Sequence, residues 1–268
     1  MKSIKPSSSE EPAIKRPGIT DYASIVRPEI CAAVAATVYA VFSIYGISHS
    51  SAPVFASITA FIVCAGAMSF SSYFSQEVEY RSSALLMAMM LSIIGILSTF
   101  TVNVDAPPLV AGIAAFSALY FWKLKRIMLI GNIAFAALAA MPFASVLLNG
   151  TIFPGAAFLP ACVFLAAAGA DIYRSVNGMM DDKAVASIAE KYGVNRARTA
   201  AAAFLMFAIV ASFAPFGLGF EGYVYMLFAL LADMVLLMAI AVHKNAPAIT
   251  AFSMALMTLA FAAGAAVL

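Results

Sequence analysis

Long apolar runs alternate with short polar breaks over most of the chain. An apolar run of about 20 residues is long enough to cross a hydrocarbon layer of about 30 Å as an α-helix. The pattern therefore predicts an all-α integral membrane protein with nine transmembrane helices. The apolar runs cover residues 29–47, 53–74, 83–102, 107–122, 127–148, 152–173, 197–217, 222–242 and 247–267.

The first residues of the chain differ in character from those that follow. Residues 1–18 are rich in Ser, Pro and charge, and they lack the apolar stretch that a signal peptide needs. We therefore expect residues 1–22 to form a disordered cytoplasmic tail. We expect residues 23–268 to form a single transmembrane domain.

Positive charge is confined to alternate breaks between the apolar runs. If the N-terminus lies inside, all 15 Lys and Arg residues lie inside too. The titratable groups of the outside loops are then His49, Asp105 and Glu221. Because Lys and Arg are enriched in cytoplasmic loops, the sequence predicts a cytoplasmic N-terminus and a C-terminus outside. It further predicts a multi-pass protein of the plasma membrane whose polar loops face the cytoplasm.

The composition agrees with a membrane protein and excludes other classes. The chain is 64% hydrophobic and 10% charged, whereas soluble domains are about half apolar and about a quarter charged. The net charge of +2 is too small to indicate a nucleic-acid partner. The three cysteines, Cys31, Cys64 and Cys162, lie in apolar runs without metal-ligand spacing, so we interpret them as packing residues.

Polar residues concentrate at the inner ends of two apolar runs. In residues 69–81, Ser71, Ser75 and Glu79 recur every four residues and so share one helix face. Residues 171–183 show a similar spacing. Polar residues stacked at a helix end beside the bilayer commonly line a water-filled cavity, but they also occur in ordinary solvated loops. In the second segment the spaced residues are Asp171, Arg174, Ser175, Gly178 and Asp182.

Two further polar features admit more than one interpretation. In residues 119–126, Tyr120 and Trp122 adjoin a basic cluster, which is typical of an interface anchor but could also hold a phosphate-bearing ligand. Asp233 lies near the middle of the eighth run, where a carboxyl group has either a functional or a structural, hydrogen-bonded role. The basic cluster consists of Lys123, Lys125 and Arg126.

The order of these segments resembles that of the UbiA-type intramembrane prenyltransferases. The likeness is greatest to the archaeal branch that attaches geranylgeranyl groups to glycerol-phosphate lipids, and it extends over about residues 23–215. Nine spans is also the number typical of that family. The matching segments are Ile25-Val26-Arg27-Pro28, Gly66-Ala67 through Glu79, Leu119-Tyr120 with Leu124-Lys125-Arg126 and Gly131-Asn132, and Asp171-Ile172 through Asp182-Lys183-Ala184, followed by Tyr192-Gly193 and Arg196-Ala197-Arg198.

The resemblance implies transfer of a prenyl group from a prenyl diphosphate to a lipid or aromatic acceptor, in membrane ether-lipid synthesis. In such enzymes two Asp-rich loops hold Mg²⁺, which binds the diphosphate, and an apolar chamber shields the tail from water. On this basis the expected catalytic residues are Glu79, Asp171 and Asp182, and the expected metal ligands are Glu79, Asp181 and Asp182. The expected substrate-binding residues are Arg27, Ser71, Ser75, Lys123, Lys125, Arg126, Arg174, Ser175 and Asn177.

The sequence departs from the family pattern at the metal ligands. The first motif of the family has Asn and Asp residues at four-residue steps, and the second loop usually has Asp at each matching position. A serine hydroxyl is a neutral, weak ligand, so these replacements remove most of the electrostatic attraction for Mg²⁺ and diphosphate. The corresponding positions here are Ser71, Ser75 and Glu79 in the first segment, and Ser175, Gly178 and Asp182 in the second.

Three functional hypotheses remain open from the sequence. The first is an active prenyltransferase with a rebuilt site, whose enzymatic activity the residues alone leave uncertain. The second is a catalytically impaired family member that binds a prenyl lipid or a partner protein. The third, which has the least support, is a small transporter built around Asp233.

Overall fold

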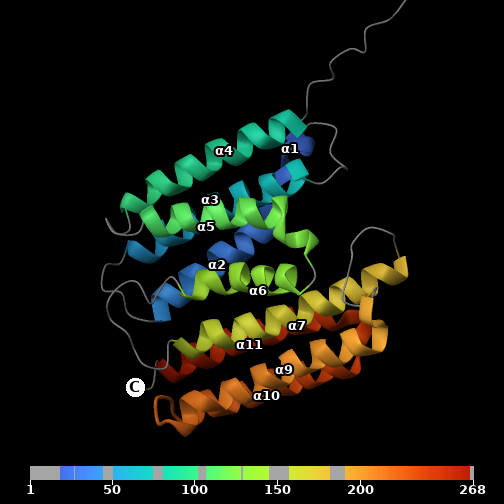
Figure 1. Ribbon diagram of the computed structural model, residues 1–268. Helices are drawn as coiled ribbons and strands as arrows, with labels where there is room; N and C mark the ends of the chain where they lie inside the picture. Colours follow the sequence, from blue (N-terminus) through green and yellow to red (C-terminus); the bar gives the residue numbers. More distant parts are fainter. Residues whose placement is uncertain are drawn as a thin grey trace, which may run out of the picture.

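The computed structural model describes residues 19–26, 28–44, 51–74, 81–101, 107–127, 129–144, 157–181 and 191–265. In this part of the chain the regular structure is helical. The long helices lie side by side with their axes roughly aligned (Figure 1). The helices are α1 (Ile19–Val26), α2 (Pro28–Ile44), α3 (Ala52–Phe74), α4 (Arg81–Ser98), η1 (Thr99–Thr101), α5 (Pro107–Trp122), η2 (Leu124–Arg126), α6 (Ile130–Ala144), α7 (Phe158–Asp181), α9 (Val194–Gly217), α10 (Tyr223–Ala241), η5 (His243–Asn245) and α11 (Ala246–Ala265).

Proline residues mark the first turns of several helices. Pro28 opens α2, Pro107 opens α5, and Pro247 is the second residue of α11. Proline suits these positions because the first backbone N–H groups of a helix have no partner within the helix. The apolar runs predicted to begin at residues 29, 107 and 247 thus start at or beside a proline that opens a helix.

Each predicted apolar run corresponds to one helix, but some boundaries were wrong. The run 127–148 begins too early, because Leu129 has a left-handed backbone with φ 58° and α6 starts only at Ile130. The run 152–173 ends too early, because α7 continues to Asp181. Helix α1 starts at Ile19, within the predicted tail 1–22, while residues 1–18 lie outside the described residues.

The outward faces of the bundle are apolar. Phe207, Val210, Leu227 and Met234 are each more than 60% exposed, which is the pattern of a lipid-facing surface. Among the described residues, six helices are long and apolar enough to cross a membrane, and three further apolar helices are shorter. The chain is thus a multi-pass membrane protein, and the count of nine crossings stays a prediction.

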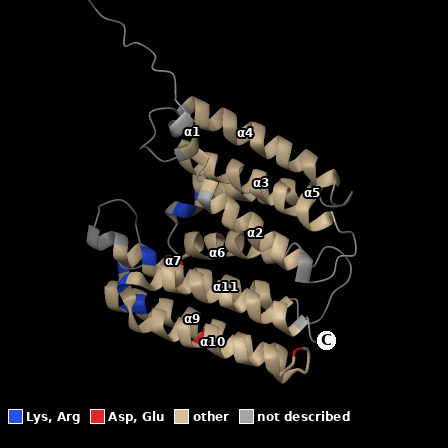
Figure 2. Ribbon diagram, turned by 180° about the vertical axis from the view of Figure 1, so that it is seen from behind, with Lys and Arg blue, Asp and Glu red and all other residues tan. Residues whose placement is uncertain are grey.

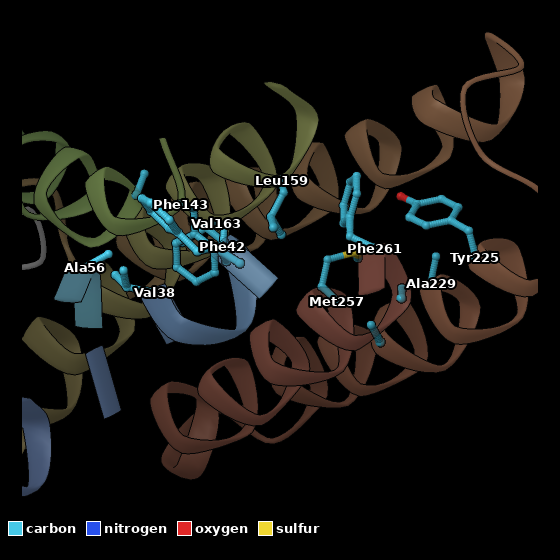
Figure 3. Packing of buried hydrophobic residues seen from close by; sticks show 14 residues of the cluster. Val38, Phe42, Ala56, Phe143, Leu159, Val163, Tyr225, Ala229, Met257 and Phe261 are labelled. Carbon is cyan, nitrogen blue, oxygen red and sulfur yellow. The ribbon is translucent and has the colours of Figure 1, made fainter. Parts of the chain in front are cut away.

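The helices form two packed groups. In the first, α3 packs against α2, α4 and α5. In the second, α7 and α10 pack against α9 and α11, and contacts of α6 with α7 and of α2 with α11 join the two groups. A buried cluster at this junction includes Phe42 of α2, Phe143 of α6, Leu159 of α7 and Phe261 of α11 (Figure 3).

The charges of the described residues are distributed unevenly along the bundle. The Lys and Arg residues lie at one end of the bundle (Figure 2). Asp171 pairs with Arg174, whereas Asp233 lies within α10 and Glu221 lies between α9 and α10. The gathering of Lys and Arg at one end is what the sequence indicated. Which side of the membrane the basic end faces stays a prediction.

Candidate functional site

An apolar chamber of about 400 Å³ lies between α2, α3, α5 and α6. Its walls include Val34 of α2, Ala60 of α3, Ile113 of α5 and Leu138 of α6. A cavity of this size and lining suits a hydrocarbon ligand. The chamber was expected from the family resemblance, although the sequence did not identify its walls.

The serine and threonine hydroxyl groups that line the chamber form hydrogen bonds within the protein. Thr59 and Ser98 hydrogen-bond to each other at 3.0 Å, and Ser117 donates to the carbonyl of Ile113 at 2.8 Å. Hydroxyls satisfied in this way present little polar surface to a ligand. The chamber therefore offers an almost entirely apolar wall.

Two aromatic residues mark the end of the chamber nearest the basic end of the bundle. Tyr120 and Phe135 both line it, and their ring centroids are 6.4 Å apart. The Arg174 guanidinium carbon lies 5.5 Å from the centroid of the Phe135 ring, a cation–π distance. The Phe135 ring thus belongs to the apolar wall of the chamber and also contacts a cation, Arg174.

A polar cluster surrounds Asp171 beside this aromatic rim. Asn132 of α6 donates from Nδ2 to Asp171 Oδ2 of α7 at 2.8 Å. Arg174 lies one turn further along α7, with its guanidinium 3.5 Å from Asp171 Oδ1. The carboxylate of Asp171 therefore holds an amide with one oxygen and a guanidinium with the other. Both contacts fix its rotamer.

Lys125 and Tyr120 extend the cluster on the side of α5 and η2. The ammonium of Lys125 interacts electrostatically with Asp171, and the Tyr120 hydroxyl interacts electrostatically with both Asp171 and Arg174. Tyr120 is 5% exposed, whereas Lys125 is exposed and the Arg174 side chain is 60% exposed. The cluster therefore has a buried aromatic base and a solvent-facing cationic edge.

The turn between η2 and α6 places Lys125 and Asn132 near each other. A Cβ on Gly131 would lie 2.9 Å from the carbonyl oxygen of Leu124, too close for a real side chain. The left-handed Leu129 reverses the chain before α6 begins. Glycine at position 131 thus permits a tight turn that brings the basic segment against the start of α6.

The structure brings together three of the predicted site residues, Asp171, Arg174 and Lys125. Lys123 is exposed on the turn just before η2, and Ser71 is half-buried near the end of α3. Glu79, Ser75, Arg27 and Asp182 lie outside the described residues, as do the side chains of Arg126 and Asp181.

Two predicted substrate-binding residues make contacts within the protein. Ser175 Oγ donates to the backbone carbonyl of Asp171 at 2.9 Å. Asn177 Nδ2 donates to the carbonyls of His243 and Lys244 at 3.1 and 3.0 Å, which ties the end of α7 to the turn between α10 and α11.

Asn132, Tyr120 and Phe135 are components of the cluster that the sequence did not mark as site residues. The available signal was the polar Asn132 within an otherwise apolar run, since such residues are costly in a membrane unless they have a partner. Tyr120 was noted beside the basic cluster but was not assigned to the site, and Phe135 gave no signal that distinguished it from an ordinary packing residue.

The described residues do not provide a set of carboxylates for Mg²⁺. Within them, no three His, Cys, Asp or Glu side chains come together. Asp171, the carboxylate of the cluster, already binds Asn132 and Arg174. Of the other proposed ligands, Glu79 and Asp182 lie outside the described residues, as does the side chain of Asp181.

Asp233 lies apart from the chamber, among α9, α10 and α11. It is 4% exposed, and its Oδ2 accepts a hydrogen bond from Ser212 Oγ at 2.7 Å. Tyr225 in turn donates to the Ser212 carbonyl at 2.6 Å. These contacts agree with the structural interpretation of Asp233. It is not among the residues that line the chamber.

Two proteins that are similar to this chain in sequence have the same name. No family model matches the chain. The digeranylgeranylglyceryl phosphate synthase of Pyrococcus furiosus is 31% identical over 174 residues, which cover 58% of this chain and 62% of the relative. The enzyme of the same name from Thermococcus kodakarensis is 26% identical over 228 residues, or 77% of this chain and 81% of the relative. The match thus spans less than two thirds of the Pyrococcus protein.

Solved structures share the fold over nearly the whole chain. A structure of digeranylgeranylglyceryl phosphate synthase superposes with a TM-score of 0.77 at 21% identity and covers 93% of this chain and 99% of its own. A UbiA homologue from Aeropyrum pernix superposes with a TM-score of 0.71 at 15% identity. The match covers 90% of this chain and 98% of the homologue. A UbiA homologue from Archaeoglobus fulgidus, bound to Cd²⁺, superposes with a TM-score of 0.66 at 14% identity. The match covers 90% of this chain and 99% of the homologue. These comparisons confirm the family resemblance and the fold.

Proposed function

We propose that this chain, a homologue of the UbiA-type prenyltransferases in sequence and fold, transfers a prenyl group from a prenyl diphosphate to a lipid acceptor. The observation that supports this function best is the apolar chamber that ends at a cationic cluster. An amphiphile with a long hydrocarbon tail and an anionic head matches both parts at once. The names of the sequence relatives favour a geranylgeranyl donor and a glycerol-phosphate lipid acceptor in ether-lipid synthesis.

The length of the chamber agrees with a geranylgeranyl tail. Its lining on α3 runs from Ala56 to Met68, a distance of about 18 Å at about 1.5 Å per residue. A 20-carbon prenyl chain has 16 carbons along its main chain, and its zigzag of bonds of about 1.5 Å reaches about 20 Å when extended. Such a tail fills the chamber with its first carbon near Tyr120 and Phe135.

In the proposed reaction the allylic carbon–oxygen bond breaks and its electron pair goes to the departing diphosphate. The acceptor hydroxyl oxygen forms the new bond to the same carbon, and its proton passes to the departing diphosphate. Arg174 and Lys125 stabilise the negative charge that develops on the leaving group. The apolar wall excludes water, which would otherwise capture the cationic carbon.

The proposal includes the orientation expected from the charges. The basic end of the bundle faces the cytoplasm, the nine apolar helices cross the plasma membrane, and the C-terminus lies outside. This orientation places the cluster where a water-soluble diphosphate head group is available. Mg²⁺, if used, would be held by Glu79, Asp181 and Asp182 and would add positive charge near the leaving group.

A second candidate is a family member that binds a prenyl lipid without transferring it. Two observations favour it: Ser175 stands at a usual Asp position and uses its hydroxyl within α7, and Ser71 is neutral. In this case the chamber would hold a prenyl lipid, and turnover would be absent.

The two candidates are separated by a transfer assay with purified protein in liposomes. The donor is labelled geranylgeranyl diphosphate, and the acceptor is geranylgeranylglyceryl phosphate. The chamber variant Ala60→Phe should abolish both donor binding and transfer, whereas Ala36→Phe, on the exposed face of α2, should retain them. Binding that depends on Ala60 without any product supports the second candidate. Product that persists in Ala60→Phe rules out the chamber as the donor site.

A further inference from the structure

We infer that the diphosphate head group is held in this chain by the side-chain cations Arg174 and Lys125, and that its binding does not require a divalent metal. The inference rests on the proposed function and specifies how the same site neutralises the head group. It departs from the metal-dependent arrangement that the resemblance implies.

The residues at the usual metal-ligand positions support this inference. Four of the six positions in the pattern are neutral here: Ser71, Ser75, Ser175 and Gly178. The hydroxyl of Ser175 is already donated to the Asp171 carbonyl at 2.9 Å. A neutral hydroxyl contributes little to the binding of Mg²⁺, which favours carboxylate and phosphate oxygens.

Asp171 does not compensate for the missing carboxylates. One of its oxygens accepts from Asn132 at 2.8 Å, and the other faces the guanidinium of Arg174 at 3.5 Å. A metal ion at Asp171 would have to displace a cation and a hydrogen-bond donor. We therefore assign Asp171 a positioning role towards Arg174.

Arg174 is placed to bind an anion at the entrance of the chamber. Its guanidinium is restrained by Asp171 on one side and by the Phe135 ring, 5.5 Å away, on the other. The side chain is 60% exposed, so its remaining N–H groups are accessible. A guanidinium presents paired donors that match two phosphate oxygens. A tail that lies along Phe135 brings its head group to Arg174.

The charge balance of the cluster favours an anion. Arg174 and Lys125 supply two positive charges, and Asp171 supplies one negative charge. Asn132 and Tyr120 are uncharged partners. Among the described residues, the cluster thus has one excess positive charge before any ligand binds, and Lys123 is exposed on the adjacent turn. This excess attracts a multiply charged diphosphate without a metal ion.

The test is calorimetric binding of geranylgeranyl diphosphate to the full chain in detergent, in excess EDTA and in millimolar Mg²⁺. We expect affinities that agree within about threefold in the two conditions. Arg174→Gln should weaken binding by about tenfold or more in both. The matched control is Arg196→Gln, an exposed arginine at the same end of the bundle, which should leave affinity unchanged.

Neutral geranylgeraniol separates loss of the head-group site from misfolding. It should bind Arg174→Gln and the unmodified chain equally well, since it needs only the chamber. A tenfold loss of diphosphate affinity in EDTA overturns the inference, whatever Arg174→Gln does, and leaves the proposed function intact. Unchanged affinity in Arg174→Gln also overturns it. Failure of both prenyl ligands to bind in Mg²⁺ overturns the proposed function itself.

Discussion

The first group of helices, α2 to α6, is hollow, whereas the second group, α7 to α11, is filled. The first group encloses the chamber of about 400 Å³. In the second, the interior is occupied by side chains such as Leu205, Leu236 and Tyr173, each no more than 2% exposed.

The two groups also use polar residues differently. In the filled group Ser212 and Asp233 bind each other at 2.7 Å, and Ser253 donates to the Ala232 carbonyl at 2.8 Å, so these contacts join neighbouring helices. In the hollow group the polar residues of the cluster gather at the chamber entrance. Packing in one group thus supports a ligand-sized space in the other, and α7 belongs to both through Asp171.

The largest expected contrast comes from adding the same side chain to each group. Ala208→Phe places a ring in the filled core, where Ala208 is 1% exposed. It should lower the free energy of unfolding by about 3 kcal/mol or more. Ala60 lines the chamber, so Ala60→Phe should change stability by less than about 1 kcal/mol while blocking the donor. Thermal unfolding in detergent measures both, and equal losses would contradict the difference in packing.

A smaller contrast is expected from two glycines. A Cβ on Gly169 of α7 would lie 2.7 Å from Leu205 Cδ2 and 2.9 Å from the Ala201 carbonyl oxygen of α9. Gly169→Ala should therefore cost about 1–3 kcal/mol, because a backbone atom must move. Gly112 of α5 has nothing within 4 Å of the added Cβ.

Gly112→Ala is thus the matched control, and it should be neutral or stabilising by up to about 1 kcal/mol. If the two variants unfolded at the same temperature, the close approach of α7 and α9 would not contribute to the stability of the protein.

The smallest effect concerns pH and the turn between α9 and α10. Glu221 is 5% exposed, and its oxygens have no hydrogen-bond partner within the described residues. Burial raises the pKa of Glu221 to about 7. Since the folded state keeps the proton to higher pH than the unfolded state, stability should fall as pH rises from about 4.5 to about 7 and then level off.

Glu221→Gln should remove this part of the pH dependence, because an amide does not ionise. The measurement is the unfolding temperature of both proteins at intervals between pH 4 and pH 8. Parallel curves for the two proteins would show that Glu221 ionises freely in the folded state.

The sequence predicted the helical architecture well, since a membrane helix is marked by composition and length over about 20 residues. It failed locally at residues 127–129, which are apolar and yet precede α6. The cause is the tight approach of Gly131 to the Leu124 carbonyl, a contact in space that hydrophobic periodicity does not register.

The candidate site was predictable only in part. Asp171, Arg174 and Lys125 are charged residues in a membrane protein, and such residues are costly unless they have a functional or paired role. Asn132 and Asp171 are 39 positions apart, and their pairing depends on how α6 packs against α7. The chamber depends on which apolar side chains leave space, and apolar composition gives no information on that point.

The shared position of Phe135 has a consequence for product release. Its ring lines the chamber and also lies beside Arg174. An intact donor therefore contacts both the apolar wall and the cationic cluster. After transfer, the inorganic diphosphate has lost its tail and keeps only the exposed, solvent-screened half of those contacts. Under the proposed function the leaving group therefore departs quickly to the aqueous side, and the prenylated lipid leaves separately into the bilayer.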